Sequence, residues 1–454
     1  MHRDGNNGDS TGSCPERNGH ENMDNTISEV LSFVEENDVK FIRLAFCDLF
    51  GVHKNITIMP SELPRAFTRG ISFEQAAVDG FREAKEDLYL FPDPGTVSVL
   101  PWRPSQGRVI RFFCDIRHAD GTPYEGCARS ILKREVARAA QFGLSCRIGT
   151  ECEFYLFRND ENGEPTMIPH DHAGYADIAP LDRGENVRRE ICLALEEMGF
   201  KPESSHHESG PGQNEIDFHF SDALSAADNL LAFRAAVKAI ASKNGLYASF
   251  LPKPFPEYSG SGMHVNFSLS RGGKNIIHAC DGQHDAMSES FVEGVLRHVS
   301  EMTAFLNPLT NSYSRFGILS APQYIGWTKG TDDLQVMRVP QVSGEHARIE
   351  LCSPDPCCNP YLAFALLIEA GLEGIENGYP LRAPAADADR AEGVQQLPDT
   401  LEAALAIAHS SALVNRVFPR QLIEQYCKAK EKECKDSSAG NAQAFERAHY
   451  FPYY

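Results

Sequence analysis

Polar and apolar residues alternate along four short segments, as expected for strands with one polar and one apolar face. In residues 147–157 (RIGTECEFYLF) the alternation places Glu151 and Glu153 on one face and apolar side chains on the other. The other segments are EIDFHF at 215–220, MHVNFSL at 263–269 and RIELC at 348–352. Their polar faces hold Glu215, Asp217 and His219, then His264, Asn266 and Ser268, then Arg348, Glu350 and Cys352.

A polar strand face either contacts solvent, as acidic residues usually do, or lines a cavity. Glutamate and histidine recur here on distant strands, which favours a cavity that holds cations. Carboxylates gathered in one pocket would repel one another at low dielectric, and divalent cations relieve that repulsion. The candidates are Glu151, Glu153, Glu208, Glu215 and Glu350. Oxygen ligands with a single imidazole favour Mg²⁺ or Mn²⁺ over a thiolate-rich zinc site.

The remaining periodicity predicts two domains after a disordered tail at 1–25, which is rich in Gly, Asn, Asp and Ser. In domain 26–118 a helix at 27–36 and a short helix at 62–69 accompany strands at 39–46, 52–58, 88–100 and 108–115. In domain 119–454 helices are predicted at 127–142, 186–198, 226–244, 287–303, 360–375, 401–415 and 422–432. The segment 360–375 is apolar almost all round and is expected to be buried.

Composition narrows the function classes. The net charge of −20 argues against a general nucleic-acid or membrane-surface role, because phosphate backbones and anionic lipids attract cationic patches. No run of about 18 apolar residues predicts a transmembrane span. The thirteen cysteines form no CxxC pairs and are interpreted as reduced thiols of a cytoplasmic protein.

Several longer motifs follow one another along the chain: GTECEFYLF, HHESGPGQNE, SGSGMHVNFSL, NPLTNSYSRF, RVP at 338–340 and ARIELCSPDPCCNPYLAFALLIEAGLEGI. Through them the chain resembles the glutamine synthetase family, type I-like, from about residue 27 onward. The resemblance implies an α+β fold with an N-terminal β-grasp domain and a catalytic domain. In the catalytic domain a curved antiparallel sheet with surrounding helices forms a funnel lined by metal ligands. It also implies a homo-oligomer, a double ring with active sites between subunits.

The implied reaction joins the γ-carboxylate of L-glutamate to ammonia or a small amine through γ-glutamyl phosphate. It uses ATP and two to three Mg²⁺ or Mn²⁺ ions per site. By resemblance, the metal nearer glutamate is bound by Glu153, Glu208 and Glu215, and the metal at the nucleotide phosphates by Glu151, His264 and Glu350. The resemblance assigns glutamate binding to Ser259, Gly260, His264 and Arg315, and ATP binding to Glu203, Asn266, Ser268, Arg338 and Arg348. Catalytic roles are expected for Arg315, Arg338 and Glu74.

The sequence departs from the family where ammonia is handled. Residues 73–77 read Phe-Glu-Gln-Ala-Ala instead of Phe-Asp-Gly-Ser-Ser, and Ser320 replaces a glutamate that precedes Ala-Pro. A serine, with a pKa far above neutral, cannot replace that glutamate as general base. Residues 332–334 (Asp-Asp-Leu) and Cys352 stand where the family usually has arginine-bearing positions.

Three functions remain open at this stage. The favoured one is a divergent member that resembles γ-glutamyl-amine ligases, with Glu74 binding the positive charge of a non-ammonia amine. The second is an authentic glutamine synthetase in nitrogen assimilation. The third is a non-catalytic structural or regulatory relative, against which the complete set of metal-type side chains argues, because packing alone does not favour buried carboxylates.

Overall fold

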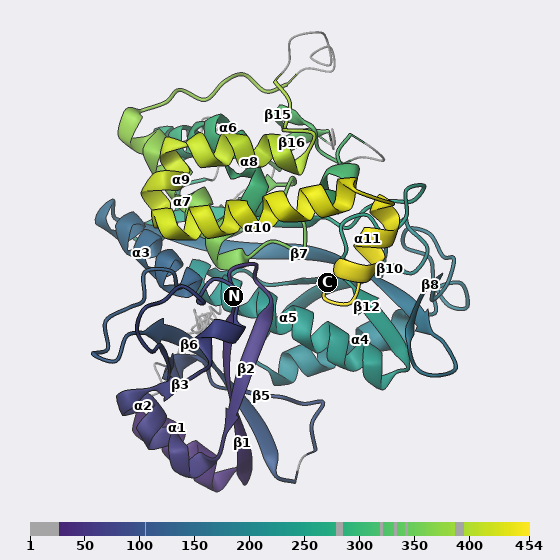
Figure 1. Ribbon diagram of the computed structural model, residues 1–454. Coiled ribbons are helices and arrows are strands. Elements are labelled where there is room, and N and C mark those ends of the chain that lie inside the picture. The colour runs from purple at the N-terminus through teal and green to yellow at the C-terminus, as the bar shows by residue number, and fades with distance from the viewer. Residues whose placement is uncertain are drawn as a thin grey trace, which may run out of the picture.

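The computed structural model describes residues 27–104, 106–277, 285–317, 321–330, 334–340, 344–385 and 395–454. The predicted tail at 1–25, Ser320 and the two aspartates at 332 and 333 lie outside these residues, as does most of a loop predicted at 384–393. Figure 1 shows a smaller N-terminal domain below a larger C-terminal domain.

The N-terminal domain is a six-stranded mixed sheet with two helices. Its elements are α1 (Ile27–Glu36), β1 (Val39–Cys47), β2 (His53–Ile58), η1 (Pro60–Glu62), α2 (Leu63–Arg69), β3 (Ile71–Ser72), η2 (Gln75–Ala77), β4 (Tyr89–Pro92), η3 (Pro94–Thr96), β5 (Ser98–Val99) and β6 (Arg108–Arg117). The strand order is β2-β1-β6-β4-β3, with β5 beside β6, and the central pair β1 and β6 is parallel. The two helices predicted for this domain are confirmed, whereas η3 divides the strand predicted at 88–100 into β4 and β5.

A tight turn joins β1 to β2, as the sequence predicted. The Asp48 carboxylate accepts hydrogen bonds from the Phe50 and Val52 amides at 3.0 and 2.9 Å. Gly51 has φ +80°, a conformation that a side chain disfavours. A Cβ there would also come within 2.7 Å of the Asn359 backbone, so this turn contacts the C-terminal domain.

An eleven-stranded sheet organises the C-terminal domain. Its strands are β7 (Leu144–Asn159), β8 (Pro165–Pro169), β9 (Pro202–His207), β10 (Gln213–Phe218), β11 (Ser221–Asp222), β12 (Leu246–Ser249), β13 (Met263–Arg271), β14 (Lys274–Asn275), β15 (Tyr324–Thr328), β16 (Gln335–Arg338) and β17 (Ile349–Leu351). The main order is β15-β16-β17-β13-β7-β10-β9. Its pairs are antiparallel except β15 and β16, which are parallel.

The helices of this domain pack against the sheet or against one another. They are α3 (Ala128–Gln141), α4 (Glu185–Glu197), α5 (Ala223–Lys243), α6 (Ala286–Leu306), α7 (Pro360–Asn377), α8 (Leu401–Ser410), α9 (Ala412–Val417), α10 (Arg420–Ser438) and α11 (Ala442–His449). Two short 3₁₀ turns, η4 (Thr310–Ser314) and η5 (Gly344–His346), complete the chain. The apolar helix α7 is buried along most of its length, which confirms the prediction. Among the described residues, no helix combines the length and apolarity needed to cross a bilayer.

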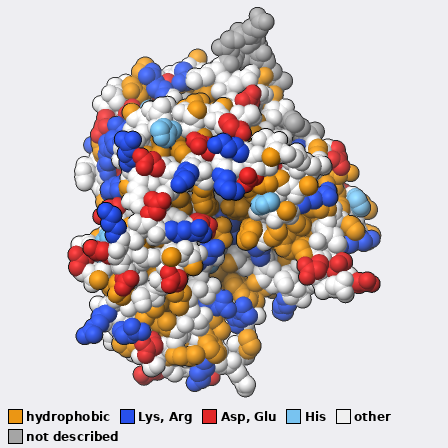
Figure 2. Space-filling view, in the orientation of Figure 1, with side chains coloured by type: hydrophobic (Ala, Val, Ile, Leu, Met, Phe, Trp, Pro, Cys, Tyr) orange, Lys and Arg blue, Asp and Glu red, His pale blue; other side chains and the backbone are white. Residues whose placement is uncertain are grey.

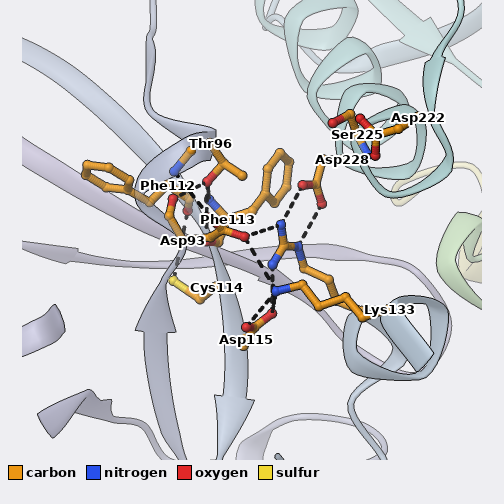
Figure 3. Close-up of polar contacts among 12 residues, drawn as sticks. Asp93, Thr96, Phe112, Phe113, Cys114, Asp115, Lys133, Asp222, Ser225 and Asp228 are labelled. Carbon is orange, nitrogen blue, oxygen red and sulfur yellow. Dashed lines mark hydrogen bonds and ion pairs between the residues drawn. The ribbon is translucent and has the colours of Figure 1, made fainter. Parts of the chain in front are cut away.

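One guanidinium links the two domains through three carboxylates (Figure 3). Arg129 on α3 is 3% exposed and bonds both oxygens of Asp228 on α5, at 3.0 and 2.9 Å. It also reaches Asp115 on β6 at 2.7 Å and Asp93 at the start of η3 at 2.9 Å. Lys133, one helical turn along α3, adds a second cation 2.8 Å from Asp115.

Candidate active site

The register of the central strands brings the predicted metal-type side chains together. Glu153 on β7 lies directly opposite Glu215 on β10, and Glu151 lies opposite His264 on β13. Asn266 on β13 lies opposite Glu350 on β17. Because these positions share the polar face of adjacent strands, the sheet itself sets their spacing.

The first cluster centres on His264. Its Nδ1 lies 3.3 Å from the Glu151 carboxylate and 3.1 Å from the Glu350 carboxylate. Arg338 on β16 donates to Glu350 at 2.9 and 2.6 Å, and the Cys352 thiol lies beside it. Burial alone would raise the pKa of Glu350, but His264 and Arg338 outweigh it and lower that pKa to about 2. Burial raises the pKa of Cys352 to about 12, so this thiol is protonated at neutral pH.

Two candidate nucleotide residues extend this cluster. Asn266 donates to Glu151 at 2.8 Å and accepts from Arg348 at 3.1 Å, so one amide connects a metal-type carboxylate with an arginine. Ser268 lies farther along β13 and is buried. Glu203 lies apart from this cluster on β9, where it is exposed and pairs with His219 at 3.0 Å.

The second cluster holds Glu208 and Glu215 with His206. One ligand-type atom from each lies within 4.8 Å of the others, and His206 lies 2.9 Å from the Glu208 carboxylate. Glu153 lies across the strand pair and accepts hydrogen bonds from the Gln213 side chain at 2.7 Å and the Gly262 amide at 3.1 Å.

The chemistry of the second cluster fits a divalent cation. Burial, followed by repulsion from Glu153, raises the pKa of Glu215 far above its ordinary value. Burial and repulsion from Glu208 likewise raise the pKa of Glu153. Acidic oxygens that repel one another in a shared, largely buried space form a donor set that a hard cation would stabilise.

Arg315 lies next to these carboxylates. It is 3% exposed, donates to the carbonyls of Ser353 and Pro354, and its Nε has no hydrogen-bond partner. A Cβ on Gly262 would lie 3.1 Å from Arg315 Nη1, 3.4 Å from His264 Nε2 and 3.6 Å from Glu153 Oε1. Glycine thus leaves space where three functional groups face one point.

The other residues assigned to substrate have different environments. The Ser259 carbonyl accepts a hydrogen bond from Tyr155, and Gly260 lies against Pro252 and Arg315. Glu74 is exposed on the N-terminal domain and caps η2 by accepting from the Ala76 amide at 3.3 Å. No described hydrogen bond or ion pair connects Glu74 with the C-terminal domain.

Sequence reasoning missed His206 and Gln213, which contact the carboxylates directly. A signal for His206 existed, because Ser204, His206 and Glu208 alternate toward the predicted cavity. His219 was predicted to share the face of Glu215, but β10 ends at Phe218 and His219 turns to Glu203 instead.

Family models match both parts of the chain. The β-grasp domain of glutamine synthetase matches residues 38–119, and its catalytic domain matches residues 125–450. The chain belongs to the glutamine synthetase family. It is therefore an ATP-dependent carbon–nitrogen ligase of a family that uses divalent metals, and the predicted family and fold are confirmed.

Relatives and solved structures agree with this assignment. Glutamine synthetase of Clostridium saccharobutylicum is 42% identical over 426 residues, covering 90% of this chain and 95% of that protein. Glutamine synthetase of Methanosarcina mazei is 43% identical over 428 residues, covering 91% and 95%. A structure described as a GmaS/ADP complex aligns with TM-score 0.83 at 28% identity, covering 92% of this chain and 99% of that one. Plasmodium falciparum glutamine synthetase, with TM-score 0.82, 22% identity and coverage of 94% and 99%, shares the fold.

Proposed function

We propose that this ligase joins the γ-carboxylate of L-glutamate to a small amine other than ammonia. The observation that supports the proposal is a contrast between the metal-type residues, which match the family, and the residues expected to handle ammonia, which do not. The metal-type side chains predicted for the family lie together on one sheet face, whereas Glu74 and Ser320 replace residues of the ammonia side.

The proposed roles follow from charge and position. Bound divalent cations would neutralise charge on the transferring phosphoryl group, and the two clusters around His264 and Glu215 would hold them. Arg315 would bind the carboxylate of glutamate. Arg338 and Arg348, next to the His264 cluster, would contact the phosphates of ATP. The ADP bound in the GmaS structure supports a nucleotide site in this fold.

In this proposal Glu74 is the residue that selects the amine. Its carboxylate is exposed and would attract an ammonium group on the acceptor. Since Glu74 forms no described hydrogen bond or ion pair with the C-terminal domain of its own chain, we propose that it acts in the site of a neighbouring copy, in a double ring.

A second candidate function is ordinary glutamine synthesis, favoured by the 42% and 43% identity to proteins named glutamine synthetase. Phosphate release from ATP separates the two functions when it is measured with glutamate, Mg²⁺ or Mn²⁺, and either ammonium or a panel of mono-, di- and polyamines. Mass spectrometry would identify the γ-glutamyl product.

Glu153→Ala serves as the inactive blank, and Glu424→Ala, which removes an exposed carboxylate far from the cluster, serves as the matched control. We expect turnover with one amine to exceed turnover with ammonium, and Glu74→Ala to raise KM for that amine but not for ATP. Ammonium as the best acceptor would overturn the amine proposal in favour of glutamine synthesis. No release above the blank with any acceptor would overturn both.

A further inference from the structure

A cavity of about 300 Å³ lies where the two domains meet, away from the metal-type side chains. The N-terminal domain contributes Arg43 from β1, His53 from β2 and Arg111 from β6. The C-terminal domain contributes Arg234 and Lys238 from α5, together with Tyr454. Figure 2 shows the hollow between the domains, with apolar side chains in its floor and Lys and Arg side chains beside it.

The four arginine and lysine side chains of this cavity lack a directly bonded acidic side chain among the described residues. No acidic side chain lines the cavity, and within the described part of the chain none of the four forms an ion pair. Arg111 is 7% exposed, and its Nε has no hydrogen-bond partner. Its guanidinium instead lies over the Phe113 ring, 4.1 Å from the centroid. Arg234 Nε is likewise buried without a partner.

Among the described residues, two of the three other buried arginines are neutralised, and the third, Arg315, lies in the candidate active site, where we propose that it binds a carboxylate. Arg129 bonds three aspartates, and Arg188 pairs with Asp182. A buried charge without a counter-ion lowers the stability of a fold. The lack of an acidic partner for Arg111 therefore needs an explanation other than the stability of the fold.

The pKa values of the cavity residues also show that burial of these side chains is not offset by acidic partners. Burial lowers the pKa of Arg111 to about 10 and that of Lys238 to about 8. Burial, followed by the charge of Arg111, lowers the pKa of His53 to about 3. The charge of the nearby Asp228 raises the pKa of Arg111 in part but does not offset burial, and the Asp228 oxygens already bond Arg129 and Tyr361.

We propose that this cavity binds a small organic dianion, a phosphate monoester or a dicarboxylate, between Arg111 and Arg234. Arginine presents a planar fork of donors that suits both groups. Arg43 and Lys238 add charge, and Trp102, Leu231 and Phe250 offer apolar surface for the carbon part of the ligand. Because the lining comes from both domains, a bound dianion would hold the N-terminal sheet against α5.

Isothermal titration calorimetry and thermal unfolding of the full chain in a phosphate-free buffer test this site. The probes are glycerol 3-phosphate and malate, with glycerol and lactate as neutral and singly charged controls. Parallel titrations of Glu153→Ala separate the cavity from the catalytic cluster. Arg111→Met and Arg43→Gln remove cations of the cavity, and Arg420→Met removes an exposed arginine of α10 as the matched control.

We expect one dianion to bind and to raise the unfolding temperature in wild type, Glu153→Ala and Arg420→Met. Arg111→Met should weaken its binding about tenfold or more, because hydrogen bonds to charged groups are among the strongest in proteins. Without the dianion, Arg111→Met should melt at or above the wild-type temperature, since it removes an unpaired buried charge. If Arg111 served only to stabilise the fold, Arg111→Met would instead lower the unfolding temperature.

The preferred probe identifies the ligand class, with glycerol 3-phosphate indicating a phosphate ester and malate a dicarboxylate. If Arg111→Met does not fold, Arg43→Gln tests the site in its place. We expect this variant also to bind the dianion more weakly than wild type. The proposal fails if neither dianion binds, if binding survives both substitutions, or if Glu153→Ala abolishes it.

Discussion

Replacing Arg129 with methionine should loosen the junction of the two domains. The substitution keeps a long side chain but removes the guanidinium that Asp93, Asp115 and Asp228 share (Figure 3). Asp228 is 5% exposed and would keep only the Tyr361 hydroxyl as a described side-chain partner, whereas Asp115 would keep Lys133 and Arg117.

The expected magnitude follows from those contacts. Burial alone would raise the pKa of Asp115, but Arg129 and Lys133 together lower it from 3.8 to about 2. That difference corresponds to about 2 kcal/mol of stability at neutral pH, shared between the two cations. Adding the uncompensated Asp228 carboxylate gives a total loss of about 3–5 kcal/mol, the usual range for breaking a buried pair.

The stabilisation that Arg129 provides through Asp115 should depend on pH in a definite direction. Because the pKa of Asp115 is lower in the folded state, its contribution is present above pH 3.8 and disappears as the pH falls through about 2. The stability difference between wild type and Arg129→Met should therefore shrink in that acidic range.

Urea unfolding at fixed protein concentration measures the effect as a shift of the transition midpoint. Asp228→Asn in the Arg129→Met background should recover part of the loss, because it removes the unpaired carboxylate. Arg420→Met, which breaks an exposed pair with Glu424, should change stability by less than about 1 kcal/mol. A loss below about 1 kcal/mol for Arg129→Met, or no recovery in the double variant, would refute this account of the junction.

Two further predictions concern the carboxylate cluster. Gly262→Ala should lower kcat about tenfold or more with little change in unfolding midpoint, because its Cβ would lie 3.1 Å from Arg315 Nη1, shift that guanidinium and fill the space that His264 and Glu153 also face. Steady-state kinetics and a thermal melt test this, and unchanged kcat would contradict it. Adding Mg²⁺ after chelation should raise the unfolding temperature of wild type more than that of Glu215→Gln, measured by calorimetry, because the ion relieves the repulsion between Glu215 and Glu153. Equal shifts would contradict that reasoning.

The sequence predicted the strands of the site well because their alternation is unambiguous. Cys152, between Glu151 and Glu153, and Phe154, which follows them, are fully buried, so only one register places these side chains in the core. Residues on β9 were harder to predict, because PESSHH lacks an apolar stripe and its pairing depends on the glycine turn before β10. The position of His206 therefore depends on this tertiary pairing, and the alternation of Ser204, His206 and Glu208 was its local signal.

Helix boundaries were also difficult to predict from the sequence. A single helix was predicted at 401–415, but the structure divides it into α8 and α9 at Ser411, whose hydroxyl accepts from the Val414 amide at 3.0 Å. Serine is a preferred N-cap, so this break had a local signal that the apolar periodicity concealed. The helix α11 was not predicted, and none of its residues is buried.

The junction between β6 and α5 contains both a balanced and an unbalanced set of charges. Asp115 and Asp228 neutralise Arg129, whereas Arg111 on β6 and Arg234 on α5 face a cavity that no acidic side chain of the described residues lines. The acids of the balanced set and the arginines of the unbalanced set come from the same strand, β6, and the same helix, α5, so their place in the fold alone does not account for this difference. The balanced set is what a permanent joint between domains requires. The unbalanced set, next to open volume, is what a reversible site for an anion requires, and its cations would be stabilised only when that anion is bound.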